Sequence, residues 1–129
     1  MRILGIDYGR RKIGLAIADG PLAEPLKILR YNDIKILSEE LEKIINKEKI
    51  EKVVVGISEG QMADETKKFI SVISHKLSVQ IETFDETLTT HEAQELSLKA
   101  GIKRKKRKEL EDAYAACVML QLYLEINYV

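Results

Sequence analysis

The chain has one cysteine, and this scarcity excludes two classes of small protein. A disulfide framework needs at least two cysteines, and a cysteine-based zinc site needs several. Cys117 lies on one helical face together with Ala113, Ala116 and Leu120. We therefore expect it to be a buried small hydrophobe rather than a nucleophile. Stability therefore has to come from an ordinary hydrophobic core.

Long apolar runs are also missing from the sequence. No run approaches the roughly 18 residues that a membrane span needs, and the N-terminus lacks the apolar region of a secretory signal. We therefore expect a cytoplasmic protein with no membrane partner. A length of 129 residues with 45% hydrophobic content suits one globular domain spanning 1–129.

Net charge is absent as well, because 21 basic residues balance 21 acidic ones. The basic residues are nevertheless clustered in two runs, which are Arg10, Arg11, Lys12 and Lys103, Arg104, Lys105, Lys106, Arg107, Lys108. Such a run is often only a solvated face, but the second run lies between two helical patterns rather than at a terminus. Basic segments held in this way are suited to contact phosphates, so both runs are predicted to bind nucleic acid.

The apolar pattern predicts a mixed sheet. Strands are expected over 2–7, 13–18, 26–31, 52–57 and 79–84. The first three have connections too short for a helix, so they should form an antiparallel meander. Helical patterns then alternate with strands, over 34–45 with Asp33 as N-cap, 64–77, 89–101 and from 106 to the end. This order predicts an α/β fold with a mixed five-stranded sheet and helices packed on it, which is the order of the ribonuclease H-like fold.

Acidic residues occur where such a sheet could bring them together. Asp7 ends the first strand, Asp85 and Glu86 follow the fifth, and Asp112 lies early in the last helix. Carboxylates crowded at one edge repel one another unless cations neutralise them, so convergence would imply metal binding. Two Mg²⁺ ions roughly 4 Å apart are a common device for phosphodiester hydrolysis. An alternative for Asp7 is that its carboxylate only caps the turn that follows it.

Four motifs together resemble one known family. They are DYGRRKIGLAIAD (7–19), VVVGISEG (53–60), DETLTTHEA (85–93) and RKKRKELEDAYAACVMLQLYL (104–124). In this order they are similar to the YqgF/RuvX family, the Holliday-junction-resolvase-like proteins assigned as nucleases of precursor 16S ribosomal RNA. The resemblance implies a ribonuclease H-like fold and makes Asp7, Glu86 and Asp112 the metal-binding, catalytic acids. Asp85 is a substitute candidate for Glu86, since neighbours on a strand point to opposite faces and one of the two reaches the metals.

The function expected from this resemblance is that of a metal-dependent endonuclease. It would use Mg²⁺ or Mn²⁺, as two ions, in processing the 5′ end of precursor 16S ribosomal RNA. Its partners would be structured RNA or branched DNA and ribosomal precursor particles, and the chain would be a monomer or weak homodimer. Two alternatives remain, a Holliday-junction resolvase acting on DNA and a non-catalytic RNA-binding factor in ribosome assembly or transcription. A resolvase would be expected to form a two-fold dimer, because it cuts two opposed strands.

Overall fold

The computed structural model describes residues 1–57, 61–85 and 111–128. Five strands form one sheet in the order β3-β2-β1-β4-β5. Their bounds are β1 (Arg2–Asp7), β2 (Lys12–Asp19), β3 (Ala23–Arg30), β4 (Lys52–Ile57) and β5 (Gln80–Asp85). β1, β2 and β3 pair antiparallel, whereas β4 runs parallel to both β1 and β5. The predicted meander and the predicted mixed five-stranded sheet are both confirmed.

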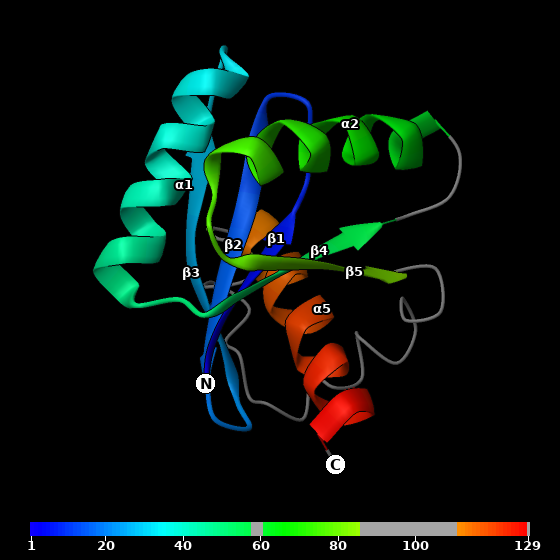
Figure 1. The fold of residues 1–129 in the computed structure, drawn as a ribbon. Coiled ribbons are helices and arrows are strands. Elements are labelled where there is room, and N and C mark those ends of the chain that lie inside the picture. The colour runs from blue at the N-terminus through cyan, green and yellow to red at the C-terminus, as the bar shows by residue number, and fades with distance from the viewer. Residues whose placement is uncertain (58–60, 86–110, 129) are drawn as a thin grey trace.

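The described helices cover the two faces of this sheet. α1 (Ile34–Glu48) and α2 (Gln61–Lys76) lie on one face, and α5 (Glu111–Tyr128) crosses the other (Figure 1). Strand alternation divides the core accordingly, because neighbouring residues of β1 point to opposite faces. Leu4 and Ile6 pack under α1 and α2, whereas Ile3 packs under α5. Among the described residues, no helix is both long and apolar enough to cross a membrane.

The start of α1 follows from local chemistry. The Asp33 side chain accepts a hydrogen bond of 2.8 Å from the backbone N–H of Lys35, which satisfies a donor that the first turn leaves unpaired. The helix ends at Glu48, and the capping residue Lys49 adopts a left-handed conformation and donates its N–H to the carbonyl of Ile45. The predicted N-cap at Asp33 is therefore confirmed.

Several element boundaries differ from the sequence expectation by one to three residues. β3 begins at Ala23 rather than at 26, and it contains Pro25 because an edge strand can tolerate a residue without an N–H. α2 begins at Gln61 rather than at 64, and β5 is shifted by one residue. The predicted helix over 89–101 lies outside the described residues, and the last helix is described from Glu111 onward.

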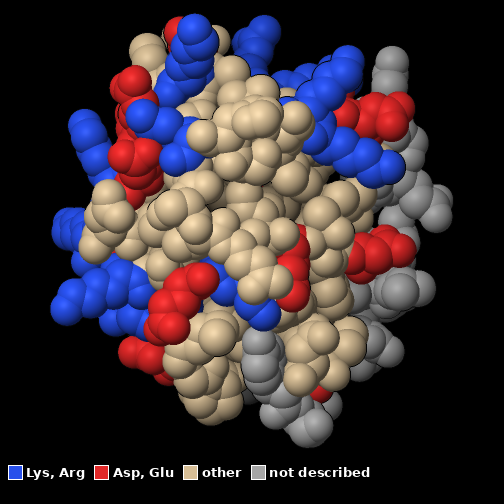
Figure 2. Space-filling model, in the orientation of Figure 1, with Lys and Arg blue, Asp and Glu red and all other residues tan. Residues whose placement is uncertain are grey.

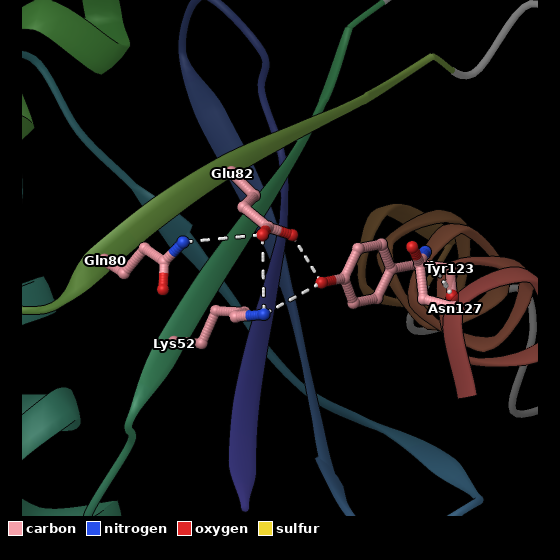
Figure 3. A network of polar contacts seen from close by, with 5 residues as sticks. All are labelled: Lys52, Gln80, Glu82, Tyr123 and Asn127. Carbon is pink, nitrogen blue, oxygen red and sulfur yellow. Dashed lines mark hydrogen bonds and ion pairs between the residues drawn. The ribbon is translucent and has the colours of Figure 1, made fainter.

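A polar network ties α5 to the amino ends of β4 and β5 (Figure 3). The Lys52 ammonium lies 3.4 Å from the Glu82 carboxylate and 3.2 Å from the Tyr123 hydroxyl, which itself donates to Glu82. The Tyr123 ring also packs edge-on against Phe84, with centroids 6.0 Å apart. The Tyr123 hydrogen bond and the Lys52 charge hold the pKa of Glu82 below its usual value, against the opposing effect of burial. The network therefore fastens the C-terminal half of α5 to the sheet.

Candidate functional site

Asp7 stands at the carboxyl end of β1, on the face covered by α5. It shares this face with Ile3, because residues of like parity on a strand point the same way. Its register partners on the two neighbouring strands are Gly14 on β2 and Gly56 on β4. Neither glycine carries a side chain, so Asp7 is the one side chain across β2, β1 and β4 at this level of the sheet. Glycine at such a position permits close approach of a ligand to the backbone.

α5 crosses β1 close to this level. A Cβ built on Gly5 would lie 3.0 Å from Cβ of Leu120 and 3.4 Å from the carbonyl oxygen of Ala116. Helix and strand are therefore in near contact, and only glycine leaves them room. The opposite half of α5 lies at the amino end of β1, where Gln121 bonds to the backbone of Ala23 and Pro21.

This direction brings the first turn of α5 toward Asp7. Asp112 lies one helical turn before Ala116, a rise of about 6 Å, and Asp7 lies two residues beyond Gly5, about 6.6 Å along β1. The backbone of residue 112 and Asp7 thus lie at the same end of the sheet and on the same face. Glu86, the third predicted acid, lies outside the described residues.

Asp85 has a different position from Asp7. It is exposed at the end of β5, where it pairs with Ile57, and its neighbour Phe84 packs on the α5 face. Strand alternation therefore directs Asp85 to the face of α1 and α2. The structure places Asp7 and Asp85 at the same edge of the sheet but on opposite faces.

The predicted basic turn follows Asp7 directly and is tight. A Cβ on Gly9 would lie 2.4 Å from the carbonyl oxygen of Lys12, so the turn requires glycine there. Lys and Arg side chains gather at the upper edge of the molecule, where Figure 1 places this turn and the start of α1 (Figure 2). Lys12 opens β2 and is half-buried, whereas Arg10 and Arg11 are exposed. The second basic run, 103–108, lies outside the described residues.

Arg10 is paired within the protein. Its Nε lies 2.8 Å from the Glu65 carboxylate on α2, and the hydrogen bond and charge of Glu65 raise the pKa of the Arg10 guanidinium. The Arg10 side chain is nonetheless 61% exposed. A phosphate approaching Arg10 must therefore compete with Glu65 or share the guanidinium with it. No sequence pattern indicates this pair, because its members are 55 positions apart.

Carboxylates are the expected donor type for a hard divalent cation, which prefers oxygen ligands. In the described part of the chain, no three His, Cys, Asp or Glu side chains lie together as a metal-holding group. Asp7 supplies one described oxygen donor at the edge. The fit of such an ion thus depends on residues 86 and 112 together with Asp7.

Comparison with known proteins identifies the family. Residues 1–126 match the family described as "RuvX: Holliday junction resolvase". The chain belongs to the RuvX family. Among RuvX relatives named "Putative pre-16S rRNA nuclease", the protein of Oceanobacillus iheyensis is 34% identical, over 97% of this chain and 98% of its own length. That of Halothermothrix orenii is 36% identical, over 99% of this chain and 96% of its own length.

Solved structures establish the fold of this RuvX chain. T. thermophilus RuvC in complex with a Holliday junction substrate superposes with a TM-score of 0.66 at 17% identity, covering 98% of this chain and 96% of that one. The Fowlpox virus resolvase in complex with Holliday junction DNA gives a TM-score of 0.64 at 13% identity, covering 100% of both chains. The predicted ribonuclease H-like fold is therefore confirmed, as a resolvase-like member of that class.

Proposed function

We propose that this RuvX protein is a metal-dependent nuclease that hydrolyses a phosphodiester bond at the carboxyl end of β1. The observation that supports this most directly is the position of Asp7. It stands between two glycines at the end of the central strand, on the face crossed by the helix that carries residue 112. The match to the RuvX family over nearly the whole chain supports the same conclusion.

The acids proposed to hold Mg²⁺ or Mn²⁺ are Asp7, Glu86 and Asp112. When bound, two such ions activate a water molecule and stabilise the leaving oxygen of the phosphodiester. Asp85 is a poor substitute for Glu86, since it stands on the face opposite to Asp7. The end of β1 positions Asp7, and the close crossing of α5 over Gly5 brings the start of that helix to the same edge of the sheet.

The basic turn is proposed to bind the nucleic-acid backbone next to this edge. Arg10, Arg11 and Lys12 follow Asp7 within five residues, so a phosphate bound at the turn lies near the proposed site of cleavage. The run at 103–108 precedes α5 and is proposed to guide the same strand toward residue 112. Backbone contacts of this kind position a substrate without reading its sequence.

The substrate we propose is the 5′ end of precursor 16S ribosomal RNA, within ribosomal precursor particles. Its support is the name carried by relatives that match this chain along its length. Branched DNA is the second candidate, which the description of the RuvX family as Holliday junction resolvases favours. Comparing cleavage of precursor 16S ends, single-stranded RNA and four-way DNA junctions would distinguish them.

The test of the catalytic proposal is Asp7→Asn, with Asp19→Asn as a matched control. Asp19 also ends a strand, but it lies at the opposite edge of the sheet, 3.7 Å from Arg2. We expect Asp7→Asn to reduce Mg²⁺-dependent cleavage by about a hundredfold or more, and Asp19→Asn to leave it unchanged. Mn²⁺ should raise the melting temperature of the wild type but not of Asp7→Asn, because binding to the folded state alone stabilises it.

Cleavage retained by Asp7→Asn would contradict the proposal. It would favour the alternative that Asp7 only caps the turn that follows it. Nucleic-acid binding without cleavage of any of the three substrates by the wild type would favour the non-catalytic RNA-binding factor.

A further inference from the structure

Tyr31 holds the basic turn at two points. It directly follows β3, and its backbone N–H donates to the carbonyl of Arg11 at 3.0 Å. Its hydroxyl donates to the carbonyl of Gly9 at 2.6 Å. These two hydrogen bonds from one residue therefore hold two carbonyls of the turn in place. The two contacts bracket Arg10.

A second tyrosine supports this arrangement from the other side. Tyr8 interacts electrostatically with the Tyr31 hydroxyl, and the Tyr8 ring stacks on Phe69 of α2 with centroids 4.9 Å apart. Burial, followed by the interaction with Tyr8, raises the pKa of Tyr31 above its ordinary value, so its hydroxyl remains a donor throughout the neutral range.

The turn that Tyr31 holds also borders open space. Arg11 and Tyr31 contribute to the wall of a cavity of about 460 Å³ between the turn and the first two turns of α1. Arg11 is therefore open to solvent on this side, in a cavity that Asp33 and Glu40 also line. Arg11 lies four residues after Asp7, so its position depends on the path of the chain through Gly9.

We propose that Tyr31 is a positioning residue, which fixes the β1–β2 turn so that Arg11 is presented to a phosphate of the bound nucleic acid. This inference rests on the proposed function, because it assumes that nucleic acid binds at the carboxyl edge of β1. Tyr31 itself need not touch the substrate. Its hydroxyl acts through the Gly9 carbonyl and its backbone through the Arg11 carbonyl.

The test compares Tyr31→Phe with Tyr123→Phe. Both variants keep the ring and lose one hydroxyl, but Tyr123 bonds to Lys52 and Glu82 at the amino ends of β4 and β5, away from the turn. We expect both to lower the melting temperature. Only Tyr31→Phe should weaken binding of a labelled precursor 16S RNA fragment, by about threefold to tenfold, which corresponds to about 0.7 to 1.4 kcal/mol. In cleavage assays KM should rise while kcat stays unchanged.

A double-mutant cycle identifies the residue through which Tyr31 acts. Arg11→Gln should weaken RNA binding and reduce the slope of log affinity against log salt by about one unit. In the Tyr31→Phe background this loss should be smaller, because the turn no longer presents Arg11 correctly. Equal losses in both backgrounds, or equal weakening by Tyr31→Phe and Tyr123→Phe, would overturn the inference while leaving the proposed function intact. A wild-type protein that binds neither RNA nor branched DNA would overturn both.

Discussion

The close crossing of α5 over β1 makes Gly5→Ala the most informative single substitution for the architecture of the proposed site. The added Cβ would lie 3.0 Å from Cβ and 3.3 Å from Cδ2 of Leu120, closer than ordinary van der Waals contact. Leu120 is completely buried and cannot turn away, so α5 must shift by a few tenths of an ångström. Overpacking of this kind costs about 1 to 3 kcal/mol, and the loss of glycine's freedom in the unfolded chain returns about 0.4 to 1 kcal/mol.

The expected net loss of folding free energy is therefore about 1 to 2 kcal/mol, or about 3 to 10 °C in melting temperature for a domain of this size. Since the displaced helix carries Asp112, we also expect cleavage at 25 °C to fall by about threefold to tenfold. Thermal melts followed by circular dichroism and initial cleavage rates, measured on the same preparations, provide the two readouts.

Gly20→Ala is the control for this experiment. Gly20 has a φ of +104°, and a Cβ there would meet nothing within 4 Å. The substitution should therefore cost about 1 to 2 kcal/mol through backbone strain alone and leave cleavage at 25 °C unchanged. If Gly5→Ala melted and cleaved like the wild type, the contact with Leu120 would not set the position of α5. If the two variants lost activity equally, the loss would reflect stability rather than the placement of the helix.

Three further outcomes follow from the side-chain contacts. Glu65→Gln removes the partner of Arg10, so nucleic-acid affinity should rise and its salt dependence should steepen; an unchanged affinity, measured by salt titration, would mean that Arg10 contacts no phosphate. Glu82→Gln should lower the melting temperature at pH 7, because a carboxylate with a depressed pKa stabilises the folded state above its usual value of 4.5. The difference in melting temperature between Glu82→Gln and the wild type should disappear as the pH falls through the lowered pKa. A constant difference across that range would exclude this linkage. Burial raises the pKa of the Cys117 thiol to about 11, so its reaction with a disulfide reagent at pH 8 should be far slower in the native protein than in denaturant; equal rates would show that the helix opens readily.

The sheet could be predicted from the sequence because its signal is local. Ile3, Leu4 and Ile6 before a glycine-containing turn define β1, and the short connections that follow allow only an antiparallel meander. The predicted start of β3 was wrong by three residues, because proline usually interrupts a strand. Pro25 lies on an edge strand, where its missing N–H costs no hydrogen bond within the sheet. Short-range sequence patterns do not predict which strand will lie at the edge of the sheet.

The candidate site was predictable only in part, for a similar reason. The position of Asp7 at a strand end follows from periodicity, but the glycines beside it become meaningful only through the register that pairs Asp7 with Gly14 and Gly56. The contacts of Tyr31 with Gly9 and Arg11 join residues about twenty positions apart, and no spacing rule indicates them. The assignment of Glu86 and Asp112 as ligands stays a prediction, which came from family resemblance.

The path of the chain between the two faces of the sheet has a consequence for how the protein is made. On a ribosome, β1, β2, β3 and α1 emerge together and can begin to assemble from neighbouring segments. The opposite face of the same strands packs against α5, which is synthesised much later, since its contacts with Pro21 and Ala23 span 94 to 100 positions. Closing so long a loop is slow, and an apolar sheet face left uncovered meanwhile can associate with other chains. We therefore expect the nascent protein to need a chaperone most just before α5 leaves the exit tunnel.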